Sequence, residues 1–257
     1  MIYFKYLRMV VKSMLQYRAN LVLLTIGQLL SVAGYFAGIA LLFARFGSLD
    51  GWSFGEVALC FGVVTAAWSL TECFARGFDV FQSTVRRGEF DRVLLRPRGT
   101  ILQILGGNFE FTRLAKLLWA FAVLGVGVTQ SGVEWSALRG LTLALMVLSG
   151  FLIFSGVFIL GASVCFWTVE GLEFINIFTD GGRELAAYPL TIYTRWIRRF
   201  FTFILPFGCF NYLPLLYVTG RSANGLYALT PLFALAFLLP CLLMWRSGVR
   251  HYQSTGN

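Results

Sequence analysis

The sequence has little charge and almost no histidine. Only 13% of its 257 residues are Asp, Glu, Lys or Arg, whereas 58% are hydrophobic and the mean hydropathy is +0.73. A soluble domain is roughly one quarter charged, because polar side chains must cover its surface. The composition therefore excludes a soluble globular protein and predicts an all-α polytopic membrane protein with one transmembrane domain.

Other absences exclude several kinds of chemistry. No Gly-Lys dipeptide occurs, so the chain has no phosphate-binding Walker loop, and any ATP that is used must be bound by another chain. The single histidine, His251, excludes a multi-histidine metal site and argues against a Ser-His-Asp triad. The five cysteines stand singly without a Cys-x-x-Cys pair, which argues against a disulfide framework or a zinc site. We expect no catalytic residue and no metal in this chain.

The formal net charge is +9. In a membrane protein the basic residues are expected at the cytoplasmic ends of helices, so we do not expect nucleic acid as a partner. Residues 1–18 place apolar side chains at spacings of three and four with basic ones between them. This pattern predicts an amphipathic interfacial helix rather than a cleavable signal peptide, with a basic arm for a soluble partner as the alternative. The transmembrane domain is then residues 19–257.

Long apolar runs predict six transmembrane helices. Five of them are expected at about residues 20–44, 54–73, 111–129, 137–169 and 226–245. The first contains Gly34-x-x-x-Gly38, a spacing that lets another helix approach closely. Arg113 and Lys116 lie in the first turns of the third, where we expect them to snorkel towards the headgroups.

The position of the remaining span is ambiguous. Hydropathy favours residues 200–218, although Pro206 and Pro214 interrupt them, and makes residues 170–193 a cytoplasmic segment. With both termini cytoplasmic, this topology leaves outside only three of the 21 Lys and Arg residues: Arg45, Arg139 and Arg221. The positive-inside rule therefore predicts that the charge-rich loop at residues 85–99 is cytoplasmic.

That loop is the densest run of charge in the chain. It reads Arg-Arg-Gly-Glu-Phe-Asp-Arg-Val-Leu-Leu-Arg-Pro over residues 86–97. Further along come Tyr188-Pro189-Leu190-x-Ile192-Tyr193, then Pro206-Phe207, and then Tyr212-x-Pro214. Together with the pattern of spans, these motifs resemble ABC-2-type transporter permeases, and more narrowly an uncharacterised family of ABC-2 export permeases once catalogued as a domain of unknown function. The resemblance covers nearly the whole chain.

The resemblance implies a non-catalytic permease subunit of an ATP-driven ABC exporter in the inner (plasma) membrane. It would form half of a translocation pathway beside a second permease chain, either a related protein or another copy, and membrane lipid would surround it. An ABC ATPase dimer would bind ATP and Mg²⁺ and dock on a cytoplasmic coupling helix between the second and third spans.

Within residues 83–97, the implied ATPase-coupling residues are Arg86, Arg87, Glu89, Phe90, Asp91, Arg92, Leu94, Arg96 and Pro97. We expect Phe90, with Val93 or Leu94, to plug an apolar notch on the ATPase. The charged side chains around them are expected to fix the register of this contact by ion pairs.

The resemblance also bears on the ambiguous region. It implies a fifth span at about residues 172–188 and a re-entrant helix pair at about residues 196–217 on the outer side, before the sixth span. This arrangement puts Asp180, Arg183 and Glu184 at membrane depth, where Arg183 can pair with either acid. It conflicts with hydropathy, because three basic residues then lie outside: Arg195, Arg198 and Arg199. We favour the re-entrant form.

An ion- or proton-coupled secondary carrier is the alternative function. Acids near membrane depth can act as proton relays, but those in this chain lie near expected helix ends or beside basic residues that can pair with them. They are Glu72, Glu110, Glu170, Glu173, Asp180 and Glu184. Such a carrier is also expected to show inverted halves, and no convincing repeat relates residues 20–129 to residues 137–246. The sequence names neither the substrate nor the direction of transport.

Overall fold

The computed structural model describes residues 16, 18–168 and 171–253. These residues form helices joined by short loops, and no strand occurs among them, which confirms the all-helical class. The amphipathic helix predicted over residues 1–18 falls almost entirely outside the described residues.

Among the described residues, four segments are long and apolar enough to cross a membrane. The first three belong to α2 (Arg18–Phe46), α3 (Phe54–Phe74) and α9 (Ala137–Val164). The fourth, Gly225–His251, comprises η4 (Gly225–Leu229), α13 (Thr230–Ala234), η5 (Leu235–Phe237) and α14 (Leu238–His251). At 1.5 Å per residue, about 20 residues cross the ~30 Å of hydrocarbon, so these helices are those of a multi-pass membrane protein.

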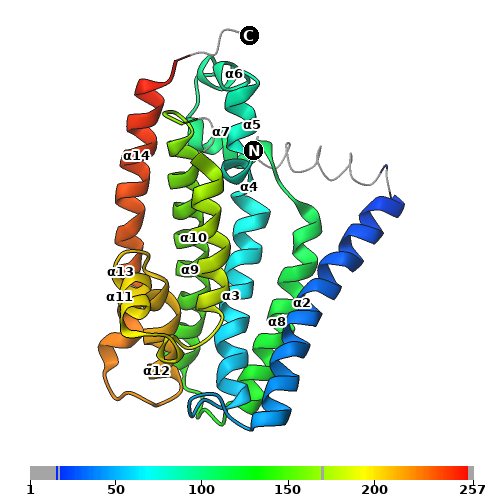
Figure 1. The fold of residues 1–257 in the computed structure, drawn as a ribbon, viewed down its shortest axis with the longest axis vertical. Helices are drawn as coiled ribbons and strands as arrows, with labels where there is room; N and C mark the ends of the chain where they lie inside the picture. The colour runs from blue at the N-terminus through cyan, green and yellow to red at the C-terminus, as the bar shows by residue number, and fades with distance from the viewer. Residues whose placement is uncertain (1–15, 17, 169–170, 254–257) are drawn as a thin grey trace.

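Two further helices, α8 and α10, belong to the same bundle of long helices. The helix α8 (Leu114–Gln130) follows the short turn η1 (Phe111–Arg113) and is apolar but only 17 residues long. The helix α10 (Gly171–Ala186) carries charged residues and is therefore less apolar. Figure 1 shows α3, α8, α9, α10 and α14 running side by side, while α2 slants away at one edge.

Short helices gather at the two ends of this bundle (Figure 1). At the end where α14 finishes lie α4 (Arg76–Asp79), α5 (Phe81–Arg86), α6 (Phe90–Leu94) and α7 (Thr100–Gly107), and we call this the α4–α7 end. At the opposite end lie η2 (Leu190–Ile192), α11 (Arg195–Phe203), η3 (Gly208–Tyr212), α12 (Leu213–Val218) and α13, which we call the α11–α13 end.

The stretch that hydropathy favours as the fifth span is sharply bent. The axes of Arg195–Phe203 and Gly208–Val218 meet at 89°. Pro206 lies in the break, and Pro214 occupies the first turn of α12, where its missing N–H is tolerated. Both arms lie at the α11–α13 end, whereas α10 runs along α9 (Figure 1).

The centre of the bundle is α3, whose side chains are almost all buried. A capping box starts this helix: Ser53 Oγ accepts from the N–H of Glu56, and Glu56 Oε2 accepts from the N–H of Ser53. Along its length α3 packs tightly on α8, because small residues let the two backbones approach. A Cβ placed on Gly127 of α8 would lie only 2.7 Å from the backbone N of Leu59.

We expect Gly127→Val to destabilise the protein, because a side chain there must push α3 and α8 apart. Overpacking of this kind costs about 1–3 kcal/mol, and the melting temperature measured in detergent should fall by several degrees. Gly125→Val is the matched control, since a Cβ at Gly125 on the same helix meets no atom within 4 Å. Equal melting temperatures for the two variants would contradict this account of the α3–α8 contact.

Candidate functional site

The charge-rich loop forms an exposed helical hairpin. The helix α5 ends at Arg86, Gly88 has a φ of +64°, and α6 begins at Phe90. Glycine suits this turn because residues with a Cβ rarely adopt a positive φ. We call residues 86–98 the basic hairpin, because arginine predominates among its exposed residues, which are Arg86, Arg87, Glu89, Arg92, Leu94, Leu95, Arg96, Pro97 and Arg98.

Phe90 does not have the role predicted for it. Its side chain is fully buried, so it cannot plug a notch on another protein. The ring stands edge-on to those of Phe81 and Tyr252, with centroids 5.2 and 4.9 Å away. The prediction failed because the short motif does not reveal that distant parts of the chain cover the face of α6 that carries Phe90. The apolar side chains that the hairpin does expose are Leu94 and Leu95, at 42% and 85%.

Phe90 belongs to an aromatic cluster that fastens the basic hairpin to the long helices. We define this cluster as Phe78, Phe81, Phe90, Phe166, Trp245 and Tyr252. Its rings come from α4, α5 and α6 and from the ends of α9 and α14, and they meet mostly edge to face. Each such pair contributes about 0.5–1.5 kcal/mol beyond burial of its area.

Hydrogen bonds reinforce this attachment. Trp245 Nε1 donates to Thr100 Oγ1 at 3.1 Å, which joins α14 to α7. Gln103 Nε2 donates to the carbonyl oxygens of Val93 and Arg98, at 3.0 and 2.9 Å, and so ties both ends of the 94–98 turn to α7. The basic hairpin is therefore built as a packed extension of the bundle.

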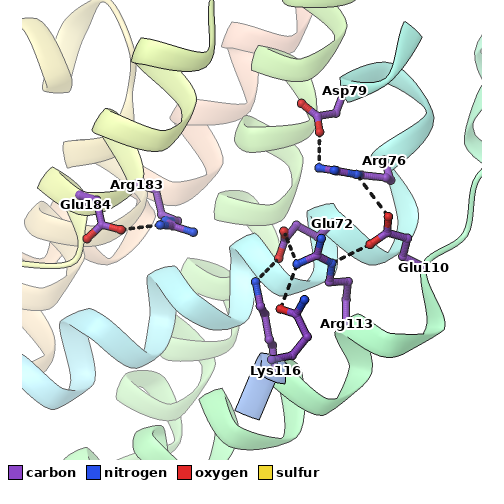
Figure 2. Close-up of polar contacts among 9 residues, drawn as sticks. Glu72, Arg76, Asp79, Glu110, Arg113, Lys116, Arg183 and Glu184 are labelled. Carbon is purple, nitrogen blue, oxygen red and sulfur yellow. Dashed lines mark hydrogen bonds and ion pairs between the residues drawn. The ribbon is translucent and has the colours of Figure 1, made fainter. Parts of the chain in front are cut away.

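A buried ion-pair network lies where α3 and α8 meet the α4–α7 end (Figure 2). Glu72 on α3 is its centre, with Oε1 3.1 Å from Arg113 Nη1 and Oε2 3.1 Å from Lys116 Nζ. Arg113 also donates to Glu110 at 2.6 Å and to Gln28 of α2 at 3.0 Å.

Arg76 extends this Glu72 network towards α4, because it pairs with Asp79 and lies 3.5 Å from Glu110. Burial raises the pKa of Asp79 against the opposing charge of Arg76, and the negative charge of Asp180 on α10 adds to the rise. Three cationic and three anionic side chains therefore meet in one neutral group that joins α2, α3, α4 and α8.

The expectation that Arg113 and Lys116 snorkel towards the headgroups is wrong. Lys116 is only 9% exposed, and Glu72 is 5% exposed. A buried charge without a partner is unfavourable, so these residues stay inside only because an opposite charge meets them there. Glu72 is 44 residues away from Lys116 in the sequence, which is why the hydropathy pattern does not reveal the pair.

The second family motif, which runs from Tyr188 to Pro214, anchors the two bent arms, which we call the bent pair α11–α12, to α3. Pro189, Leu190, Pro206, Tyr212 and Pro214 are buried, and Tyr188 and Tyr193 are half-buried. Within the same motif, Thr191 Oγ1 accepts a hydrogen bond from Trp52 Nε1 at 2.9 Å. Asn211, which sequence analysis missed, donates through Nδ2 to the carbonyl oxygen of Ala186 at 2.7 Å and contacts Cys60. Its only signal in the sequence is a lone amide inside an apolar run.

Three charged residues of α10 were expected at membrane depth, and two of them pair with each other. Arg183 pairs with Glu184, one of its two predicted partners (Figure 2). Its guanidinium also lies over the ring of Trp68, 5.1 Å from the centroid. Asp180 is exposed and acts electrostatically on Asp79 at the α4–α7 end.

A second charged contact, also missed in the sequence, lies at the opposite end of α3. Arg221 donates to both carboxylate oxygens of Glu56, at 2.6 and 2.7 Å, and to the carbonyl oxygen of Gly51. Its guanidinium lies 4.1 Å from the centroid of the Trp52 ring. This contact closes the loop after α12 onto the start of α3.

In the described part of the chain, no group of three or more His, Cys, Asp or Glu side chains is placed to hold a metal ion. The five cysteines are free, and all but Cys209 are buried.

Glu72→Gln should destabilise the protein strongly, because it leaves Lys116 buried without a counter-charge. Breaking a buried pair in this way costs about 3–5 kcal/mol, measured as a lower melting temperature in detergent. Glu89→Gln is the control: its partner Arg87 is 3.8 Å away on the surface, and such changes stay within about 0.5 kcal/mol. Adding Lys116→Met to Glu72→Gln should restore part of the loss, and a further drop would contradict the proposed pairing.

A family model described as "ABC-2 family transporter protein" matches residues 29–256, a range that includes the basic hairpin, the Glu72 network and the bent pair. No curated protein and no solved structure matches the chain. With the match covering most of its length and several helices suited to cross a membrane, the chain belongs to the ABC-2 transporter family as a multi-pass permease.

Proposed function

We propose that this chain is the permease subunit of an ATP-driven ABC exporter and that it couples to a separate ATPase through the basic hairpin. The observation that carries the proposal is the construction of the hairpin, which combines a basic exterior and exposed leucines with a buried aromatic base. A loop that only obeyed the positive-inside rule would need no such base, because its charge alone satisfies that rule.

The exposed side chains suggest how the ATPase is contacted. Leu94 and Leu95 supply apolar area that would be buried in a notch, while Arg87, Arg92 and their neighbours would pair with acidic residues at its rim. A buried apolar centre with a charged rim is the usual anatomy of a protein interface, and the charges set orientation more than affinity. Phe90 then supports the contact from inside the permease.

Two connections would carry movement of the ATPase into the membrane. The aromatic cluster joins the hairpin to the ends of α9 and α14, so displacement of α6 acts directly on both helices. The Glu72 network joins the segment that follows the basic hairpin to α2, α3 and α8, through Gln28, Glu72 and Arg113. Rigid packing of this kind favours movement of whole helices over local deformation.

We further propose six membrane crossings: α2, α3, α8, α9, α10 and the segment Gly225–His251. The bend of 89° between Arg195–Phe203 and Gly208–Val218 supports a re-entrant pair before the last crossing. With the basic hairpin cytoplasmic, both termini lie inside, and the chain belongs in the inner (plasma) membrane. Arg183 at depth is then accommodated by Glu184 and the face of Trp68.

A second permease chain, related or identical, would complete the pathway. Most side chains of α2 are exposed, and a Cβ at either Gly34 or Gly38 would meet no atom within 4 Å. An apolar helix with an open small-residue face suits contact with another membrane helix. The ATPase dimer would supply the ATP and Mg²⁺ sites, and this chain would supply half of the channel.

The ion- or proton-coupled carrier is less well supported. Three of the six acids considered as relays are engaged: Glu72 by Arg113 and Lys116, Glu110 by Arg113, and Glu184 by Arg183. A relay needs a carboxyl group that gains and loses its proton during transport, and a closely held cation opposes protonation.

The coupling proposal predicts the effect of changing the hairpin tip. The chain purified from its native membranes should carry a stoichiometric soluble partner with a Walker loop and should hydrolyse ATP. Arg92→Glu combined with Leu95→Glu should weaken that association by about tenfold or more, as expected when interface centre residues are replaced. Membrane insertion and melting temperature should be unchanged, because both side chains are exposed.

Arg45→Glu provides the matched control, because Arg45 is also exposed but lies at the end of α2 that faces away from the hairpin. It should leave association and ATP hydrolysis intact. A chain that purifies alone as a homodimer and drives flux in response to an ion gradient would contradict the proposal and favour the carrier.

A further inference from the structure

The helix α11 presents an amphipathic surface at the α11–α13 end. Arg195, Arg198 and Arg199 lie at spacings of three and four, so their side chains share one face of the helix. Beside this face, Trp196 and Phe203 are 73% and 80% exposed. A helix that exposes arginines beside large apolar side chains is suited to the boundary between lipid headgroups and acyl chains, because neither water nor hydrocarbon alone suits both kinds of side chain.

The three arginines have no counter-charge in the described part of the chain. None of them forms an ion pair with a described acidic side chain. Arg198 lies within hydrogen-bonding reach of the Tyr212 hydroxyl, which leaves the positive charge unbalanced. In the proposed topology this end of the bundle lies outside, where arginines are uncommon. Because like charges at these spacings repel each other, the face points to an anion that arrives from outside the chain.

A groove between α11 and α12 offers a place for that anion, and we call it the α11–α12 groove. Arg198, Arg199 and Tyr227 supply hydrogen-bond donors to its lining, and Leu213 and Leu216 supply an apolar wall. Arg199 is exposed, and the other four are half-buried, so a ligand can reach them. The groove encloses about 250 Å³, whereas a single water needs about 10–15 Å³, so it has room for a phosphate and the atoms joined to it.

The lining favours a phosphate that is attached to an apolar body. A planar guanidinium can bind two phosphate oxygens at once, and the hydroxyl of Tyr227 can add a further hydrogen bond. A free phosphate would leave Phe203, Leu213 and Leu216 uncovered, whereas the glycerol and acyl chains of a lipid would lie against them. Clustered arginines also favour a lipid of net negative charge over one whose headgroup carries its own ammonium group.

We propose that the α11–α12 groove binds the headgroup of one anionic phospholipid of the outer leaflet, with Arg198 and Arg199 holding its phosphate and Arg195 beside them. The acyl chains pass over Phe203 into the hydrocarbon. This site goes beyond the proposed transport function, because the lipid is a partner that holds the bent pair at the membrane surface and is not the transported substrate. It rests on the proposed membrane position of α11.

Native mass spectrometry of the full chain in detergent measures this binding directly, because it counts the lipids bound to each molecule. Separate titrations with dioleoylphosphatidylglycerol and dioleoylphosphatidylcholine give the dissociation constant of the first bound lipid. Phosphatidylglycerol should bind at least about tenfold more tightly, because the arginines repel the ammonium group of the choline lipid. Equal affinity for the two lipids would overturn the proposal.

Arg198→Gln combined with Arg199→Gln should remove this preference and weaken binding of phosphatidylglycerol about tenfold or more, because charge-assisted hydrogen bonds to the phosphate are lost. Arg198→Lys combined with Arg199→Lys should keep part of the preference, because both charges remain. The ratio of the two affinities within one variant does not depend on how much of the sample is folded. An unchanged ratio in the glutamine variant would place the lipid elsewhere on the chain and contradict the assignment.

Arg45→Gln combined with Arg139→Gln is the matched control. It removes two charges from the same end of the molecule, where Arg45 lies near the end of α2 and Arg139 lies beside Gly220, but neither residue lines the groove. This variant should keep the native preference for phosphatidylglycerol. Loss of the preference here as well would show that overall charge, rather than the groove, attracts the lipid.

A melting-temperature assay distinguishes the lipid from a soluble anion. Phosphatidylglycerol should raise the melting temperature of the full chain in detergent, because a ligand of the folded state stabilises it. The rise should persist in an excess of inorganic phosphate at constant ionic strength. If phosphate alone reproduced the rise and the lipid added nothing, the groove would bind a soluble anion and the proposal would fail. Neither assay contains ATP or an ATPase, so both outcomes are separate from coupling through the basic hairpin.

Discussion

The pairing of Glu72 with Arg113 and Lys116 is the interaction on which the arrangement of the helices depends. All three charges lie in a largely apolar bundle, where each one alone would be strongly unfavourable. They are stable only while α3 and α8 keep their register, which the tight glycine contact at Gly127 also requires. Through Gln28 the same group holds α2, a helix with few other buried contacts. The Glu72 network therefore specifies one arrangement of the helices as well as stabilising it.

The two ends of α3 are held by different kinds of interaction. At the α4–α7 end, aromatic packing and the Glu72 network hold the short helices against the bundle, so this end is rigid although it projects furthest. At the other end, Arg221, Glu56 and Trp52 close the loop after α12 onto the helix start. Between these anchors nearly all side chains of α3 are buried.

Sequence patterns predicted much of this structure. The runs assigned to α2, α3, α8 and α9 match within a few residues, because length and apolarity are local properties. The exposed basic hairpin was also recognisable, since its charges are clustered within residues 86–98. Hydropathy did not reveal the bend of 89° between Arg195–Phe203 and Gly208–Val218, because local apolarity carries no information on the direction of the chain. Phe90, Lys116 and Asn211 were misjudged or missed for a related reason: their partners lie from tens of residues to more than 150 residues away.

The contact between Glu56 and Arg221 has a consequence for the order in which the protein is made. The two residues are separated by 165 positions, so the ribosome completes α3 and most of the following helices before the guanidinium exists. Until then the carboxylate of Glu56 is held by the capping box that it forms with Ser53 at the start of α3. A newly inserted α3 is therefore capped but not yet bound to Arg221, and its N-terminal end becomes fixed only when nearly the whole polypeptide has been synthesised.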